Sequence, residues 1–425
     1  MAETTIKTVR ARQLIDCKCR PLVEVDVMTE GGCLGRGSAP TGSSVGSLEC
    51  KVLRDGNSSE YGGFGVRHAV RNVNEIIAPR LIGMDVRDQA GIDRTMKELD
   101  GTDDKHVLGG NAIYSTSIAS FRAAAASEGV PLYRYIAGDS IRTIPIPSFN
   151  VINGGKNGNV VQGFNEFIVM PYRAENIEQA VEIGVLVFQR LGSVIERYTK
   201  AEPMVGRSYG WVAPSEDPEE CLKLIGEAID ECGYTDRCAF ALDCANSEMY
   251  DAATKTYYLN GRRRSGDEMI GYAKGLTEKY PFVFIEDMLD ENDWEGFAKA
   301  KREIKRTLIL ADDFIVTNPA RIRRAVSMNA IDGFILKPNQ VGTITEALEA
   351  YSLARQHGLI ATPSGRAGGV IGDVVMDLAV GLQVPFIKNG CPRSGERIDK
   401  LNFLMRAADL NPGSRLSNID SLIRF

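Results

Sequence analysis

The stretch PFVFIEDMLDENDWEGFAKAKREIKRTLILADDFIVTNPARIRRAVSMNAIDGFILK (residues 281–337) decides the fold of this chain. It contains the short apolar runs FVFIED, TLILADD and GFILK, separated by amphipathic segments of helical length. The runs are continuously apolar, which is typical of strands covered on both faces in a parallel sheet. The stretch therefore predicts alternating strand–helix units.

The same pattern extends in both directions along the second half of the chain. Further apolar runs are CAFALDCA near residue 238, LIATPS near 359 and PFIKNG near 385. Asn318 and Pro319 have the residue types of an N-cap and a first helical residue, and Gly358 marks a helix end. Repeated strand–helix units favour an α/β fold, either a β/α barrel or an open doubly wound sheet.

The first part of the chain has a different organisation. VRARQLIDC and RPLVEVDVMTEGG alternate apolar and polar residues, which predicts strands, and the pair Gly31–Gly32 predicts a hairpin connection. Residues 66–127 show helical periodicity. The polar, proline-containing stretch AGDSIRTIPIP predicts a boundary between an N-terminal α+β domain (1–138) and a barrel domain (139–425).

Composition excludes several classes of protein. Of the 425 residues, 44% are hydrophobic and 25% charged, as in globular proteins, and the net charge of -6 disfavours nucleic-acid binding. No apolar run is long enough to span a bilayer, and the start lacks a secretory signal, so we expect a cytoplasmic protein without membrane or nucleic-acid partners. With only 3 His, none beside a serine-nucleophile motif, carboxylates and lysines are the expected catalytic groups.

Charged residues end successive apolar runs. They are Asp243, Glu286, Asp312, Lys337 and Lys388. The carboxyl ends of barrel strands meet at one mouth, where catalytic groups gather, so we expect these side chains to converge. Three converging carboxylates repel one another unless a cation lies among them, and oxygen ligands without His suit Mg²⁺. The alternative is that these residues only form salt bridges at a sheet edge.

The two lysines complete a chemical hypothesis. A divalent cation on a substrate carboxylate stabilises the dianion that forms when the neighbouring proton is removed. One lysine, with its pKa depressed by the cation, would take that proton, and the other would hold the developing charge. The residues thus predict proton abstraction α to a carboxylate.

Motifs throughout the chain resemble those of enolase, the 2-phosphoglycerate dehydratase. In the second half these are ALDCANSEMY, FIEDMLDENDW, ADDFIVTNPARI, ILKPNQVGT and IKNGCPRSGERIDKLN, and the first half agrees through APTGSSVG, NVINGG and NEFIVMP. The resemblance implies an enolase-type β/α barrel with an antiparallel start, preceded by an N-terminal α+β domain. It also implies two Mg²⁺ per active site and a homodimer.

Residue roles follow from the resemblance. It assigns the tightly held Mg²⁺ to Asp243, Glu286 and Asp312. It makes Lys337 the base that removes the C2 proton and places Lys388 beside the substrate carboxylate. Glu166, in NEFIVMP, matches an active-site Glu, and Ser44, in TGSSVG, matches a ligand of the second Mg²⁺.

The chain departs from the enolase pattern at three loops. Enolase has GDEGGFAP, whose Glu is the general acid, whereas this chain reads GRSYGWVAP (206–214). The NGG motif is followed here by Lys156 and Asn157 instead of a residue and His, and SHRSGE has become SGRAGG, without the His. The substrate-binding candidates in these loops are Lys156, Asn157, Arg207, Ser208, Tyr209, Ser364 and Arg366.

These departures leave three hypotheses. The first is a Mg²⁺-dependent enzyme that acts on 2-phosphoglycerate- or phosphoenolpyruvate-type acids through an enolate. The second is an enzyme similar to carboxyphosphonoenolpyruvate synthase of phosphonate antibiotic pathways, because Arg207, Lys156 and Arg366 would suit a different or larger anion. The third is a catalytically inactive enolase fold that binds a partner. Since loss of a general acid costs ~10²- to 10⁴-fold in rate, efficient dehydration is in doubt.

Overall fold

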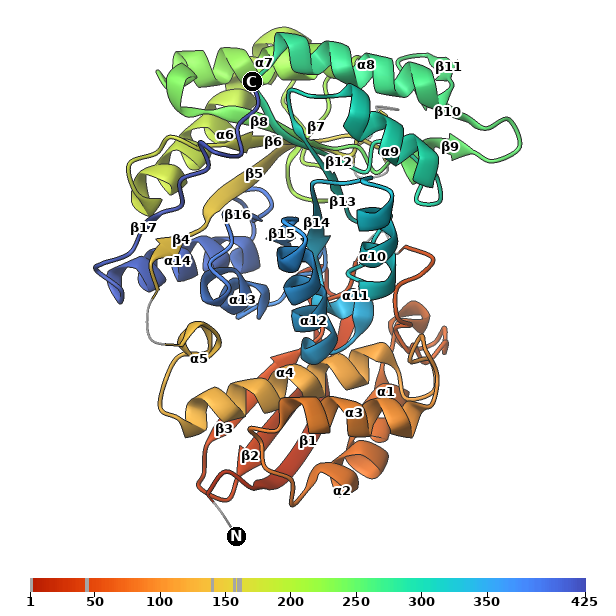
Figure 1. Cartoon of the computed structure of the whole chain (residues 1–425), viewed down its shortest axis with the longest axis vertical. Helices are drawn as coiled ribbons and strands as arrows, with labels where there is room; N and C mark the ends of the chain where they lie inside the picture. Colours follow the sequence, from red (N-terminus) through yellow and green to blue (C-terminus); the bar gives the residue numbers. More distant parts are fainter. Residues whose placement is uncertain (1–2, 43–45, 139–140, 156–157, 159–162) are drawn as a thin grey trace.

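The computed structural model describes residues 3–42, 46–138, 141–155, 158 and 163–425. Figure 1 shows a smaller N-terminal part below a larger part in which helices surround a curled sheet. Within the described residues, no helix is both long and apolar enough to cross a membrane. The expected domain boundary adjoins residues 139–140, which lie outside the described residues, and stays a prediction.

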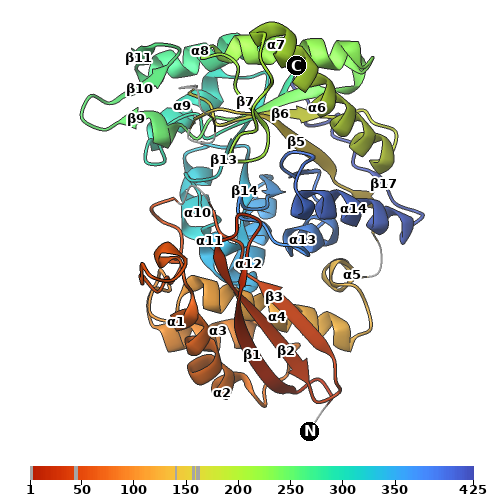
Figure 2. The same ribbon diagram turned by 180° about the vertical axis from the view of Figure 1, so that it is seen from behind.

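The N-terminal part is an antiparallel sheet covered on one face by helices (Figure 2). Its strands are β1 (Ile6–Ile15), β2 (Pro21–Thr29) and β3 (Leu34–Ser38). Its helices are α1 (Arg67–Arg71), α2 (Ala78–Leu81), α3 (Gln89–Asp100), α4 (Gly110–Ser127) and α5 (Leu132–Ala137), with further helical turns at Tyr61–Gly63 and Asn72–Ile77. The pair Gly31–Gly32 lies in the β2–β3 hairpin, as expected.

Helix α4 lies unusually close to strand β3 because β3 presents two glycines to it. A Cβ atom on Gly35 would lie 2.0 Å from the carbonyl oxygen of Ala119, and one on Gly37 would lie 2.2 Å from that of Ser115. Glycine in a strand often marks such an approach of another backbone. The Ser115 hydroxyl uses the short separation to donate a 2.9 Å hydrogen bond to the carbonyl of Val23.

Replacing Gly37 with alanine should destabilise the protein, because the added methyl group overlaps a backbone that cannot move independently. We expect the free energy of unfolding to fall by about 1–3 kcal/mol, measured by urea denaturation. Gly226→Ala is the matched control, because a Cβ atom on Gly226 meets no atom within 4 Å. Equal stability of the two variants would show that β3 and α4 can separate freely.

The larger part is built on one curled sheet. Its strands are β5 (Ile146–Asn153), β6 (Glu166–Met170), β7 (Trp211–Val212), β8 (Ala239–Asp243), β12 (Phe282–Glu286), β13 (Leu308–Ala311), β14 (Gly333–Leu336), β15 (Ile360–Pro363) and β16 (Phe386–Lys388). The order is β15-β14-β13-β12-β8-β6-β5-β16, with β7 beside β5. Pairs β5–β6 and β6–β8 are antiparallel, and the strands from β8 to β15 are parallel. An isolated parallel bridge between Ser364 and Lys388 joins the two ends, so the expected barrel with an antiparallel start is confirmed.

Helices surround this barrel (Figure 1). They are α6 (Ile177–Thr199), α7 (Pro218–Glu231), α8 (Gly266–Lys279), α9 (Trp294–Glu303), α10 (Pro319–Ser327), α11 (Pro338–Val341), α12 (Ile344–Gln356), α13 (Val375–Gly381) and α14 (Gly395–Asp409). Asn318 caps α10 as expected, since its side chain accepts a hydrogen bond from the Ala320 amide. Strands β8, β12, β13 and β14 are buried throughout, which confirms coverage on both faces.

Apolar side chains from strands throughout the sheet order fill the inside of the barrel. Phe284 of β12 and Phe386 of β16 stack there with ring centroids 5.6 Å apart, in a cluster that also includes Ile168 and Ile335. The charged residues come last in their strands, or directly after them. The short strands elsewhere are β4 (Thr143–Ile144), β9 (Tyr250–Asp251), β10 (Thr256–Leu259), β11 (Arg262–Arg264) and β17 (Arg415–Leu416). The barrel thus has an apolar interior and a polar mouth.

Candidate active site

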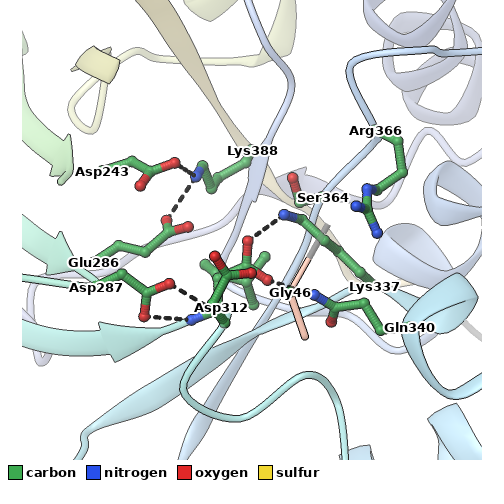
Figure 3. Close-up of polar contacts among 12 residues, drawn as sticks. Gly46, Asp243, Glu286, Asp287, Asp312, Lys337, Gln340, Ser364, Arg366 and Lys388 are labelled. Atoms are coloured by element: carbon green, nitrogen blue, oxygen red, sulfur yellow. Dashed lines mark hydrogen bonds and ion pairs between the residues drawn. The ribbon is translucent and has the colours of Figure 1, made fainter. Parts of the chain in front are cut away.

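The structure brings the five charged strand-end residues together at the mouth of the barrel (Figure 3). Asp243 and Glu286 are the last residues of β8 and β12, and Asp312 directly follows β13. Lys337 directly follows β14, and Lys388 is the last residue of β16. Parallel register explains the convergence, because Glu286 pairs with Asp243 across neighbouring strands.

Lys388 is surrounded by carboxylates. Its Nζ lies 3.0 Å from Asp243 Oδ2, 2.6 Å from Glu286 Oε2 and 3.8 Å from Glu166 Oε2. Glu166 reaches this group because β6 runs antiparallel to β8, which places its first residue beside the last residue of β8. Burial lowers the pKa of Lys388, but Asp243 and Glu286 outweigh it, so the pKa lies well above its usual value and the ammonium stays charged.

Lys337 forms a separate pair with Asp312. Its Nζ donates to Asp312 Oδ2, while Asp312 Oδ1 accepts a 2.8 Å hydrogen bond from Gln340. Burial lowers the pKa of Lys337, but the Asp312 carboxylate more than offsets burial, and the pKa is raised. The depressed pKa expected from the sequence applies when a divalent cation lies beside Lys337, and it stays a prediction.

Carboxylates of the mouth have the donor set of a divalent-cation site. Glu286, Asp287 and Asp312 each offer an oxygen within 4.8 Å of the others. Glu286 is fully buried, and its Oε1 has no hydrogen-bond partner among the described residues, although buried polar atoms are normally paired. Such an oxygen fits a ligand of a hard cation. These residues therefore fit a bound divalent metal.

The charges of the side chains at the mouth also favour a bound divalent metal. The carboxylates of Glu166, Asp243, Glu286 and Asp312 face the two ammonium groups described above. When all are ionised, these contacts place four negative charges around the two ammonium groups, while Arg366, Arg397 and Lys400 line other parts of the cavity. A divalent cation bound there would neutralise the excess negative charge around the two ammonium groups.

Asp287 was not predicted as a site residue, although it directly follows Glu286 in FVFIED. Its backbone has φ 44°, in the left-handed region, which is uncommon for a residue other than glycine. Its carboxylate accepts hydrogen bonds from the backbone amides of Asp312, at 2.9 Å, and Asp313, at 2.8 Å. Asp287 therefore also positions the loop that carries Asp312.

The N-terminal part contributes to the mouth through Glu49. Both Glu49 carboxylate oxygens accept hydrogen bonds from Arg366, at 2.7 and 3.1 Å, and both residues are buried. Burial lowers the pKa of Arg366, but Glu49 outweighs it and raises the pKa. Ser364 lies beside Lys388 in the barrel-closing bridge and lines the same cavity as Arg366.

Three residues of the altered loop at residues 206–214 differ in their burial and in their contacts. Ser208 is buried and lines the cavity, and its carbonyl accepts a hydrogen bond from Arg397. Arg207 is exposed. Tyr209 donates its hydroxyl to the carbonyl of Cys17 at 3.0 Å, and the Arg397 guanidinium lies 5.2 Å from its ring centroid.

Sequence reasoning also missed functional candidates outside the strand ends. The cavity and its surroundings include Glu49, Asp313, Gln340, Asn389, Arg397 and Lys400. Asn389 directly follows Lys388 and Asp313 directly follows Asp312, so proximity could have indicated both, whereas the others come from loops and helices. The expected site residues Ser44, Lys156 and Asn157 lie outside the described residues.

Comparison with known proteins gives matches over nearly the whole chain. Residues 6–136 match the family model "Enolase, N-terminal domain", and residues 141–414 match "Enolase, C-terminal TIM barrel domain". An enolase of Methanopyrus kandleri is 44% identical over 405 residues, covering 94% of this chain and 95% of the relative. An enolase of Methanococcus maripaludis is 39% identical over 421 residues, covering 99% of both chains.

Proposed function

Because this chain belongs to the enolase family, we propose that it is a Mg²⁺-dependent enzyme of the lyase type. Its substrate would be a 2-phosphoglycerate- or phosphoenolpyruvate-type acid. The reaction would begin with removal of the proton next to the substrate carboxylate. The single observation that carries this proposal is the presence of the buried Lys388, the partly buried Lys337 and a group of carboxylates in one cavity.

Different residues of the chain would have different roles in that proton removal. Lys337 would accept the substrate proton at Nζ once its ion pair with Asp312 is broken and its ammonium has released a proton to solvent, which leaves the neutral amine. Lys388 stays protonated and would donate hydrogen bonds to the carboxylate on which negative charge develops. Asp243, Glu286 and Asp312 would hold Mg²⁺, with Asp287 beside the last two, and the ion would supply Lewis-acid stabilisation of that charge. Burial of all these groups would exclude bulk water from the proton transfer.

The second half of the enolase reaction has weaker support. Expulsion of the 3-hydroxyl requires an acid, and where the family motif has Glu this chain has Ser208 or Tyr209, of which Ser208 lines the cavity. This substitution favours a second candidate, in which the enolate carbon skeleton is kept and another group is transferred, as in carboxyphosphonoenolpyruvate formation. An inactive scaffold is disfavoured, because it would have no need to bury two lysines among carboxylates.

Proton exchange separates these candidates. In D₂O with Mg²⁺ and 2-phosphoglycerate, we expect deuterium to enter C2, measured by NMR, at a rate that falls when EDTA removes the metal. Exchange accompanied by phosphoenolpyruvate would support the dehydratase, and exchange without it would support group transfer. If neither exchange nor Mg²⁺ binding is found, the chain is a scaffold. The homodimer and the cytoplasmic location stay predictions.

A further inference from the structure

A second cavity lies at the end of the barrel opposite to the mouth. Strands β15 and β16 begin beside it, at Ile360 and Phe386, whereas their other ends lead to Ser364 and Lys388 at the mouth. Its volume of about 860 Å³ is within the range of small-molecule sites in proteins. No residue lines both this cavity and the candidate active site among the residues described. The two spaces are therefore separate.

Apolar side chains form much of the wall of this second cavity. Those that keep part of their surface exposed come from the end of α5, from the segments before β15 and β16, and from the C-terminal segment: Ile136, Leu359, Leu382, Pro385 and Leu422. Covering such apolar surface with an apolar group is favourable, because water is released. The wall therefore fits a ligand with an apolar body.

Two arginines give the same cavity a positive charge. Arg142 and Arg355 both line it and are exposed, and within the described ranges neither forms an ion pair and no acidic residue lines the cavity. Arg355 Nη1 donates a 3.2 Å hydrogen bond to the hydroxyl of Tyr351, which donates in turn to the carbonyl of Leu382 at 2.9 Å. Both partners also line the cavity, so these contacts hold the guanidinium at its wall.

The backbone of Arg142 is also held in place. Its amide donates a 3.0 Å hydrogen bond to the side chain of Gln383, and its carbonyl accepts one of 3.0 Å from the amide of Arg415. Arg355 lies in the last turn of α12, where a cation interacts favourably with the helix dipole. Arg142 directly precedes β4 and belongs to no helix. A role at the end of its own helix is thus open to Arg355 alone.

We propose that this cavity binds an organic anion, whose apolar body contacts the leucine side chains and whose carboxylate or phosphate group contacts Arg142 and Arg355. Guanidinium groups bind both kinds of acid through paired, charge-assisted hydrogen bonds. Such a ligand matches the two properties of the cavity, its apolar wall and its unbalanced positive charge. The site is additional to the active site and does not depend on the reaction proposed above.

The test compares four probes that differ in one property at a time. Ligand-detected NMR titration in EDTA would measure the affinity of native protein for hexanoate, hexyl phosphate, 1-hexanol and acetate. We expect at least one of the two six-carbon acids to bind about 10-fold or more tightly than 1-hexanol, which lacks the charge, and than acetate, which lacks the chain. The tighter of the two acids identifies the acid group that the site prefers.

Variants of the arginines locate the binding. Combining Arg142→Gln with Arg355→Gln should weaken the tighter acid by about 10- to 100-fold and leave 1-hexanol within about twofold. Arg302→Gln, at an exposed arginine of α9, is the matched control and should bind like native protein. Combining Arg142→Lys with Arg355→Lys keeps both charges and should retain more affinity than the glutamine pair, which guards against a loss caused by misfolding.

Several results would overturn the site. They are no binding of either acid by native protein, equal affinity for 1-hexanol or acetate, native affinity in the glutamine pair, and an equal loss in Arg302→Gln. A lower free energy of unfolding in the glutamine pair, with unchanged affinity, would assign the arginines to a structural role and would also overturn it. Exchange at C2 is measured separately, so failure of either proposal leaves the other standing.

Discussion

Replacing Lys337 with alanine is expected to lower C2 proton exchange by at least ~10²- to 10⁴-fold, because the variant lacks the group that accepts the proton. Lys337 is the partly buried amine paired with Asp312, and its loss leaves that carboxylate without this counter-charge. Mg²⁺ should therefore bind the variant at least as tightly as the native protein. Deuterium incorporation followed by NMR and Mg²⁺ titration by calorimetry measure the two effects separately.

Loss of C2 exchange together with retained Mg²⁺ binding is the result expected if Lys337 is the base. A merely structural role for Lys337 would reduce exchange and metal binding together, through loss of folded protein. Lys274→Ala, at an exposed position of α8, controls for removal of a lysine in general. Exchange at the native rate in Lys337→Ala would refute the assignment of the base, even if the rest of the proposed site were correct.

Lys388→Met is expected to have the largest effect on stability. The ammonium lies 2.6 Å from Glu286 Oε2 and 3.0 Å from Asp243 Oδ2, and methionine would leave these buried carboxylates without a cation. Removing one partner of a buried ion pair typically costs about 3–5 kcal/mol. We expect a loss of this size in the free energy of unfolding in EDTA, measured by urea denaturation.

Magnesium should reverse part of this loss. A divalent cation that binds the folded state stabilises it in proportion to the logarithm of its concentration, and the variant offers an even more negative site. Millimolar Mg²⁺ should therefore stabilise Lys388→Met more than the native protein. If the variant unfolds like the native protein in EDTA, or if Mg²⁺ stabilises both equally, the carboxylates at Lys388 do not form a cation site.

The sequence indicated the strand–helix units well because their signal is local, whereas the choice of a barrel over an open doubly wound sheet came from the resemblance to enolase. Each continuously apolar run had to be covered on both faces, and each except LIATPS ended in a charged residue that could not remain inside. Asp243, Glu286 and Lys388 could thus be placed at one mouth from strand pattern alone. The antiparallel order of β5, β6 and β8 has no comparable local signal and came only from the resemblance to enolase.

The parts of the site that escaped prediction depend on contacts between distant segments. Glu49 and Arg366 are 317 residues apart, and no spacing rule relates them. Lys400 lies within an ordinary helical stretch, and its ammonium enters the cavity because Gly365 has no side chain there. Asp287 has a local signal, the second acid of FVFIED, but its role depends on a left-handed backbone that the sequence does not reveal.

The barrel is closed by the pairing of β16 with β5 and by the bridge between Ser364 and Lys388. The strand carrying Lys388 therefore docks on a strand made more than half a chain earlier, a non-local contact with a high entropic cost of closure. During synthesis on the ribosome, Asp243 and Glu286 are added to the chain before Lys388, whose ammonium balances their charge. A chain truncated before β16 would lack Lys388 and could not close the barrel. We therefore expect such a product to be inactive rather than partly active.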